Sequence, residues 1–182
     1  ARLSAGATAA LQEIARQHRL TLNCLVQGAW ALLLSRISGD RDVVFGSTVS
    51  GRPPELSGVE AMVGVFINAL PVRARVPASG ALLPWLQEFM AQQVEREQHA
   101  WSSLVDIQAW SGVRPGEPLF ESLVIFENYP LRESEDGRIG IADVRLFRRA
   151  NFPLTLVVSP EAGLHLAISF DTSRFHAATI ER

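Results

Sequence analysis

The chain has 182 residues, of which 47% are hydrophobic and 20% are charged, a composition typical of one folded domain, or one lobe of a larger domain. Seventeen basic and nineteen acidic residues leave it almost neutral, which argues against a nucleic-acid partner. A single cysteine excludes an internal disulfide and a multi-cysteine metal site.

The longest apolar run, around "AWALLL", is far shorter than the roughly 20 residues that a membrane span needs. No cationic segment with a cleavage site opens the sequence, so we expect a cytoplasmic protein that does not bind membranes. Because the chain starts at Ala1 and enters helix-like sequence at once, we expect it to be part of a longer protein.

The first part of the chain predicts two helices. Residues 4–18 carry apolar side chains at helical spacing, and a second helix, capped by Thr21, follows the i, i+3, i+4, i+7 rule as far as Ile37. A row of small side chains runs beside the apolar stripe of the second helix, so we expect another backbone to approach closely there. These small residues are Cys24, Gly28, Ala31 and Ser35.

After the two helices come strands, then a further helical region, then a meander of strands, and the last third reads as a β-hairpin. The sequence therefore predicts an α+β fold: a two-layer sandwich lobe in which helices pack on a mixed β-sheet. The expected elements are strands at 42–50, 62–76 and 119–128, a loop at 51–60, helices at 82–101 and 102–110, a polar segment at 129–140, hairpin arms at 154–158 and 164–170, and a helix beginning after 171.

The stretch "MVGVFINALPVRARV", residues 62–76, places one amide in an apolar strand. With a period of two, Asn68 shares a face with Phe66 and Leu70. A buried amide without partners costs about 1–3 kcal/mol. Asn68 is therefore either a hydrogen-bonding strut or a residue that faces a solvated channel, and we favour the strut because most buried amides are hydrogen-bonded.

No complete catalytic set emerges from the residues themselves. We interpret Cys24 as a small hydrophobic residue in a packed helix, and no glycine-rich phosphate loop is present. Arg52, between a glycine and a proline at the end of a strand, could clamp a carboxylate or phosphate bidentately or form a structural salt bridge. The histidines stand singly and predict no metal site: His18, His99, His165 and His176.

Several ordered motifs resemble the second half of the condensation domains of nonribosomal peptide synthetases. The core "MVGVFINALPVR" is similar to a family motif of a glycine, an aromatic residue, Asn, Leu and Arg, and "EREQHAWSSLVDIQ" and "RPGEPLFESLVIFENYP" resemble two later motifs. The resemblance covers nearly the whole chain. The motif residues are Gly64, Phe66, Asn68, Leu70, Arg73, His99, Pro118, Leu119 and Phe120.

The resemblance implies a chloramphenicol-acetyltransferase-like fold of two similar lobes, with the active site in a tunnel between them. Residues 1–182 then form the C-terminal lobe. The family's catalytic motif, two adjacent histidines followed after three residues by Asp-Gly, belongs to the N-terminal lobe and does not occur here. We therefore expect no catalytic residue in this chain and regard Arg52 and Asn68 as the candidates nearest the tunnel and substrate.

The resemblance also implies a reaction and its partners. Donor and acceptor peptidyl carrier domains present thioesters on phosphopantetheine, an adenylation domain lies adjacent in the polypeptide, and no cofactor or metal is expected on this chain itself. The chain would supply one tunnel wall and a carrier-docking surface for amide formation, and would be inactive alone. The alternatives are a non-catalytic lobe that serves as an interaction platform, and a variant for epimerisation, cyclisation or ester formation.

Overall fold

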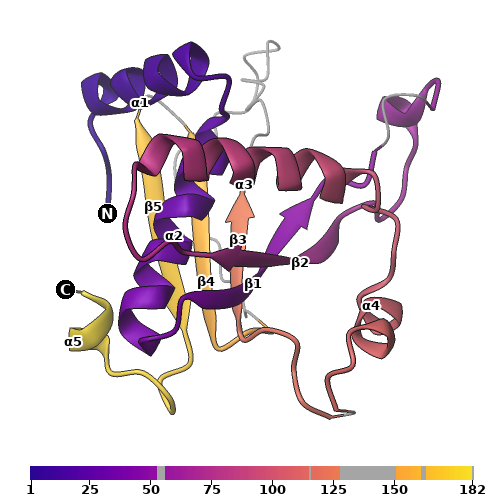
Figure 1. The fold of residues 1–182 in the computed structure, drawn as a ribbon. Coiled ribbons are helices and arrows are strands. Elements are labelled where there is room, and N and C mark those ends of the chain that lie inside the picture. The colour runs from indigo at the N-terminus through magenta and orange to yellow at the C-terminus, as the bar shows by residue number, and fades with distance from the viewer. Residues whose placement is uncertain (53–55, 115, 128–150, 161–162, 182) are drawn as a thin grey trace, which may run out of the picture.

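A computed structural model of the chain describes residues 1–52, 56–114, 116–127, 151–160 and 163–181 (Figure 1). Its elements follow in the order α1 (Ala5–Gln17), α2 (Leu22–Ser38), β1 (Asp42–Val49), a 3-10 turn η1 (Val59–Ala61), β2 (Asn68–Arg75), α3 (Leu82–Glu97), α4 (Leu104–Trp110), β3 (Ser122–Phe126), β4 (Leu154–Pro160), β5 (Leu164–Phe170) and α5 (Ala177–Ile180).

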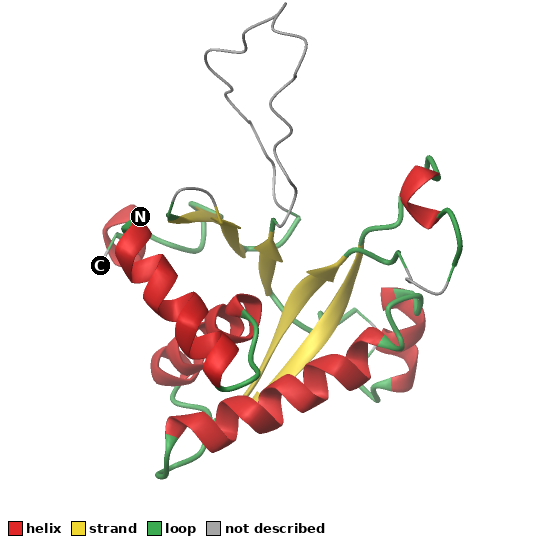
Figure 2. Ribbon diagram, turned by 90° about the horizontal axis from the view of Figure 1, so that it is seen from above, coloured by secondary structure: helices red, strands yellow, loops and turns green. Residues whose placement is uncertain are grey.

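The strands form one mixed sheet with the order β2-β1-β3-β4-β5. Strand β1 is antiparallel to β2 and parallel to β3, β3 is parallel to β4, and β4 and β5 form the expected antiparallel hairpin. Helices α1, α2 and α3 lie on one face of this sheet, whereas no described helix covers the other face (Figure 2). The predicted α+β class, with helices layered on a mixed sheet, is confirmed.

The core lies between the sheet and the helix layer. Alternate residues of the strands point toward the helices, as the two-residue period of a strand requires. The fully buried Phe45, Val72 and Val124 come from β1, β2 and β3, respectively. Trp30 of α2 crosses this layer and donates from Nε1 to Oγ of Ser122 on β3, at 2.9 Å. The hydrogen bond satisfies the polar end of a large buried ring.

Local sequence features set the ends of the helices. Oγ1 of Thr21 accepts from the backbone N–H of Cys24 at 3.0 Å, which caps α2 as predicted. At the other end of α2, Gly39 adopts φ 76°, a left-handed conformation that glycine takes without steric cost. Two of the small residues on α2 pack on α3 as expected: Sγ of Cys24 lies 3.6 Å from the backbone oxygen of Leu86, and a Cβ at Gly28 would lie 2.5 Å from Cδ2 of Leu86.

Three predicted elements need correction. The strand expected over 62–76 begins only at Asn68, because Val63 and Val65 are fully exposed and find no neighbouring strand. Helix α3 ends at Glu97 rather than 101, and Gln93 on its inner face is buried. Strand β3 is also shorter than predicted, and the polar segment 129–140 lies outside the described residues.

Among the described residues, no single helix is long and apolar enough to cross a membrane. Helices α1 and α2 together have the length and composition of a membrane span, but the two helices are bent by 101° relative to each other. The apolar side of α2 belongs to the hydrophobic core.

The close approach of Phe120 to β1 gives a first testable prediction, because Gly46 leaves room for its ring. A Cβ at residue 46 would lie 2.7 Å from Cζ of Phe120 and 2.9 Å from Cδ1 of Leu123, both buried. We expect Gly46→Ala to lower the free energy of unfolding by about 1–3 kcal/mol, the usual cost of overpacking a core. Urea denaturation of the two proteins measures the difference.

Gly6→Ala is the matched control, because Gly6 lies in α1 with no atom within 4 Å of an added Cβ. That change should leave stability unaltered or raise it by up to about 1 kcal/mol through helix propensity. Equal stability of the Gly46→Ala protein and the parent would show that Phe120 does not constrain β1.

Candidate functional site

Asn68 is the first residue of strand β2, and both polar atoms of its side-chain amide form hydrogen bonds. Its Nδ2 donates to the backbone oxygens of Ala100 at 2.9 Å and Ser102 at 2.7 Å, and its Oδ1 accepts from the N–H of Ala69 at 2.9 Å. We call these four residues the Asn68 corner. Three hydrogen bonds account for the polar residue in an apolar stretch, and they tie the sheet to the turn that follows α3.

The Asn68 corner joins two motifs that are far apart in the sequence. The N–H of Ser102 donates to the backbone oxygen of His99 at 3.0 Å, and Ser102 itself is buried. The turn that carries His99 is therefore fixed to the start of β2. The His99 side chain is exposed, however, and the Asn68 amide binds the main chain of this turn rather than the imidazole ring.

Arg52 contacts the described part of residues 51–67, called here the 51–67 loop. Its guanidinium donates to the backbone oxygens of Val59 and, at 3.1 Å, of Met62. The same group lies 4.2 Å from the centre of the Phe66 ring, in a cation–π contact. In this structure Arg52 therefore holds loop carbonyls and an aromatic ring, where the sequence suggested a carboxylate or phosphate clamp or a salt bridge.

The described part of the 51–67 loop presents apolar side chains to solvent. Val63 and Val65 are fully exposed, and Ile67 is more than half exposed. Across the Asn68 corner, the segment around α4 exposes Trp101 by 79% and Trp110 by 71%. Large exposed apolar patches of this kind mark surfaces that contact other protein segments.

Among the other motif residues, Leu70 and Phe120 are packed in the interior, whereas Pro118 and Gly64 are exposed. Leu70 is 2% exposed and pairs across the sheet with Ser47, and the Phe120 ring stacks on Phe152 with centroids 5.1 Å apart. Pro118 is exposed and Leu119 half-buried in the approach to β3. Gly64 is exposed, and a Cβ there would lie 3.3 Å from the ring of Phe66.

Arg73 is paired with Asp42 across the β1–β2 ladder. Nε and Nη2 of Arg73 donate to the two carboxylate oxygens at 2.7 and 2.6 Å. The hydrogen bond from this guanidinium lowers the pKa of the Asp42 carboxyl below its ordinary value. The bidentate geometry fits a positioning contact between neighbouring strands.

Cys24 carries no catalytic character in this structure. Its side chain is fully buried, and desolvation by burial raises the pKa of its thiol to about 11. Within the described ranges, no three His, Cys, Asp or Glu side chains are grouped so that they could hold a metal ion.

Sequence reasoning missed the partners of Asn68, because the acceptors are main-chain oxygens whose position depends on the turn after α3. It also missed Gln27, which is 1% exposed and donates to Ser47 at 3.0 Å and to Asn23 at 2.9 Å. A polar side chain on the inner side of an otherwise apolar helix was the available indication.

Comparison with known proteins defines the class. The family model "Condensation domain" matches residues 1–182. One of the linear gramicidin synthase proteins of Brevibacillus parabrevis is 50% identical over 175 residues, which are 95% of this chain and 3% of that protein. Chondramide synthase cmdD of Chondromyces crocatus is 43% identical over 181 residues, 98% of this chain and 5% of that protein.

Solved structures show the same fold. The first condensation domain of the calcium-dependent antibiotic synthetase, in complex with substrate analogue 3a, is 19% identical with a TM-score of 0.79, over 100% of this chain and 40% of that one. The four-domain nonribosomal peptide synthetase holo-AB3403, bound to AMP and glycine, is also 19% identical, with a TM-score of 0.87 over 100% of this chain and 15% of that one.

The chain belongs to the condensation domain family of nonribosomal peptide synthetases, with the chloramphenicol-acetyltransferase-like fold that the motifs implied. It spans only a few per cent of the length of the two curated relatives, 3% of the gramicidin synthase protein and 5% of the chondramide synthase.

The Asn68 corner predicts a loss of stability when its amide is removed. Asn68→Ala leaves two backbone oxygens and one N–H without partners, so we expect the free energy of unfolding to fall by about 1–3 kcal/mol. Denaturant midpoints of this chain measure the change. A midpoint equal to that of the parent would mean that water replaces the amide and that Asn68 does not hold the corner.

Asn151→Ala serves as the matched control, because Asn151 is an exposed asparagine outside the regular elements. Its replacement should change stability by no more than about 0.5 kcal/mol. A comparable loss in both variants would assign the effect to asparagine removal in general.

The Asp42–Arg73 pair predicts a pH-dependent contribution to stability. A carboxyl whose pKa is lower in the folded state contributes stability above its unfolded-state pKa and loses it as the pH falls through the folded-state value. Asp42→Asn should therefore destabilise the chain near neutral pH, and the difference from the parent should close toward about pH 2. Urea midpoints at several pH values test this.

Glu88→Gln is the control for charge, because Glu88 is an exposed carboxyl of α3 that forms no ion pair with a described residue. A deficit in the Asp42→Asn protein that stays constant from neutral to acid pH would contradict the ion-pair interpretation.

Proposed function

We propose that residues 1–182 are the C-terminal lobe of a condensation domain that forms amide bonds between carrier-bound aminoacyl or peptidyl thioesters. The observation that carries this proposal is an asymmetry of the lobe. Helices cover one face of the sheet (Figure 2), while fully exposed Val63 and Val65 project from the 51–67 loop. Such a lobe buries this apolar surface only against another protein segment.

The comparisons support a partner lobe for that surface. The whole chain aligns with only 40% of a solved condensation domain, so a domain of that kind contains more protein than this chain provides. In the proposed arrangement, the side of the sheet that no described helix covers and the 51–67 loop face the N-terminal lobe and form one wall of the tunnel.

In the proposed reaction, the amine of the acceptor aminoacyl thioester attacks the carbonyl carbon of the donor thioester. The new C–N bond forms, the C–S bond breaks, and the donor carrier's phosphopantetheine thiol is released with the proton lost by the amine. The paired histidines of the other lobe would move or position that proton. Donor and acceptor carrier domains and an adjacent adenylation domain are the proposed partners.

The contribution of this chain would be positioning. Arg52 fixes the shape of the 51–67 loop through carbonyls and the Phe66 ring, and Asn68 fixes the turn at the end of α3. Both groups would set the tunnel wall rather than touch the reacting atoms. Small errors in the position of bound reactants have large effects on rate.

A second candidate function is a non-catalytic interaction platform. The specific observation in its favour is the apolar surface around α4, where Trp101, Val105 and Trp110 are all more than 70% exposed. This surface would serve a docking partner whether or not the N-terminal lobe carries intact histidines.

The test uses the complete condensation domain and this chain alone, with carrier-bound aminoacyl thioesters followed by mass spectrometry. We expect dipeptidyl thioester from the complete domain and none above background from the chain alone. In the complete domain, the double change Val63→Ser with Val65→Ser should lower the rate by about tenfold or more. In the isolated chain, the same change should alter the free energy of unfolding by no more than about 0.5 kcal/mol.

Val94→Ser is the matched control, because Val94 is a half-exposed valine on the outer side of α3. It should leave the rate of the complete domain unchanged. Product formed by the chain alone would refute the assignment to one lobe, and an inactive complete domain would favour the platform. An undiminished rate in the double variant would contradict the role of the loop.

A further inference from the structure

Strand β2 lies at one edge of the sheet, so one side of its backbone has no neighbouring strand in the described part of the chain. The N–H of Val76 donates to the backbone oxygen of Arg41, at 2.7 Å, just beyond the β1–β2 ladder. Because backbone groups alternate between partner and edge in antiparallel pairs, Ala74 turns its N–H and C=O toward β1, and Arg73 and Arg75 turn theirs outward.

The open edge is short. Pro71 has no N–H to offer, and the N–H of Ala69 is occupied by Oδ1 of Asn68. At the other end, Nε1 of Trp85 donates to the backbone oxygen of Arg75 at 2.8 Å. Around Arg73 and Arg75, the backbone groups without a partner among the described residues are the N–H and C=O of Arg73 and the N–H of Arg75; toward Asn68 the open edge offers only the C=O groups of Ala69 and Pro71.

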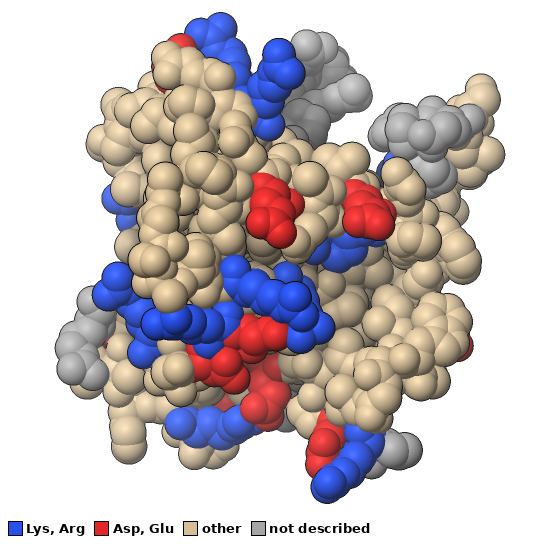
Figure 3. Space-filling view, in the orientation of Figure 1, with Lys and Arg blue, Asp and Glu red and all other residues tan. Residues whose placement is uncertain are grey.

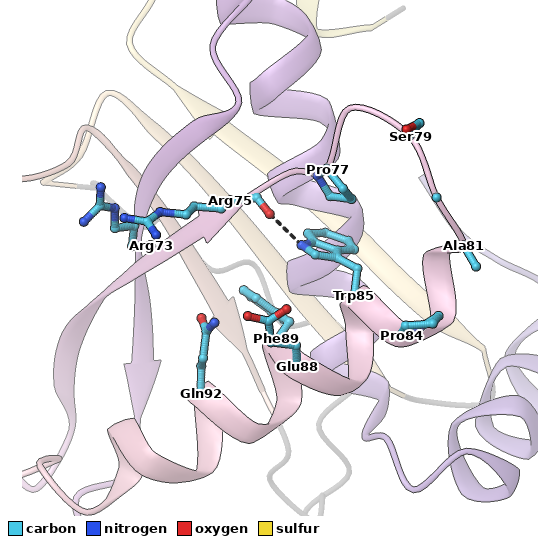
Figure 4. A pocket seen from close by; sticks show the side chains of 11 residues that line it. Arg73, Arg75, Pro77, Ser79, Ala81, Pro84, Trp85, Glu88, Phe89 and Gln92 are labelled. Carbon is cyan, nitrogen blue, oxygen red and sulfur yellow. Dashed lines mark hydrogen bonds between the residues drawn. The ribbon is translucent and has the colours of Figure 1, made fainter.

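Arg73 and Arg75 also line a cavity of about 500 Å³ between β2 and α3 (Figure 4). The Trp85 and Phe89 rings, stacked with centroids 5.8 Å apart, give it an apolar wall on the helix side. An edge strand facing a helix across an apolar groove is the geometry in which domains bind an extended peptide as an added strand.

Charge in the groove is divided between its two sides. The side chains of Arg73 and Arg75 lie beside each other, whereas Glu88 projects from α3 (Figure 4). Arg73 is held bidentately by Asp42, but Arg75 reaches that carboxylate only through Nε at 3.5 Å and is mostly exposed. Basic and acidic side chains gather below α3 on this face of the molecule (Figure 3).

We propose that this groove binds an extended segment with an acidic–apolar–acidic pattern as an added antiparallel strand. Arg75 and Arg73 project from the same face of the sheet, so one acidic residue would pair with Arg75 and the other with Nη1 of Arg73, which the bidentate contact with Asp42 leaves free. The apolar residue between them would face Trp85 and Phe89. Glu88 would repel an acidic side chain from the helix side and so fix which face of the strand turns inward.

The strength of such a contact indicates the source of the segment. Three added backbone hydrogen bonds, at about 0.5–1.5 kcal/mol each, correspond to a free-peptide affinity in the millimolar range or weaker. A flexible linker supplies an effective concentration of about that size. We therefore assign the segment to the synthetase polypeptide itself. This assignment of the source rests on the proposed function, whereas the binding of the segment to the groove does not.

The probe is the peptide acetyl-Ser-Glu-Val-Glu-Ser-amide, added at about 5 mM to the 15N-labelled chain while amide exchange is followed by NMR. We expect the amides of Arg73 and Arg75 to exchange at least about threefold more slowly. Ala74, already bonded within the ladder, is the internal control and should not change. Arg75→Ala should weaken the protection that the peptide gives at Arg73.

Two control peptides separate strand addition from general association. The same peptide N-methylated at both glutamates lacks the N–H groups that would face β2, and the lysine analogue acetyl-Ser-Lys-Val-Lys-Ser-amide reverses the charge. Both should give no protection. Equal protection by either control, or no protection by the probe, would overturn the proposal.

Protection that rises with the concentration of the chain alone would assign the edge to a second copy and would also overturn the proposal. For the source, the Arg73 amide should exchange more slowly in the longer synthetase polypeptide than in this chain, and equal rates would overturn that assignment. Amide exchange and product formation are separate readouts. An inactive condensation domain would not affect the protection of the Arg73 and Arg75 amides, and a failure of the peptide to protect them would not affect the proposed reaction.

Discussion

The structure depends on the hydrogen bonds that Asn68 makes at the start of β2. Its amide reaches the backbone oxygens of Ala100 and Ser102, more than thirty residues later in the chain. One residue thereby fixes where the strand begins and where the turn after α3 lies. The exposed segments on either side, the 51–67 loop and the region of α4, extend from this corner.

The lobe has a packed core on the helix side of the sheet, whereas the 51–67 loop exposes apolar side chains. The helices and one face of the sheet form a continuous core with fully buried Phe45, Val72 and Val124. Val63, Val65 and much of Ile67 in the 51–67 loop remain in solvent, although burying each such side chain is worth about 1.5–3 kcal/mol. This free energy is available to a partner lobe, and the same arrangement leaves the edge of β2 and its groove accessible.

The two arginines of β2 show how one strand both pairs with β1 and keeps donors available for a binding partner. Arg73 is bound by Asp42 and contributes to the pairing of β1 and β2. Arg75, two residues later, makes only a long contact with the same carboxylate. Alternation along the strand gives both residues the same face, while the geometry of the pair satisfies one guanidinium and leaves the other with free donors.

The sequence by itself determined the helices, the cap at Thr21, the β4–β5 hairpin and the family, because these depend on local spacing and short motifs. Only the tertiary structure decided that β2 begins at Asn68, that Arg52 binds loop carbonyls and that Gln93 faces the core. Each of these results depends on contacts between residues distant in the chain. The period of a pattern shows that a residue shares a face with its neighbours, but it does not show what lies opposite that face.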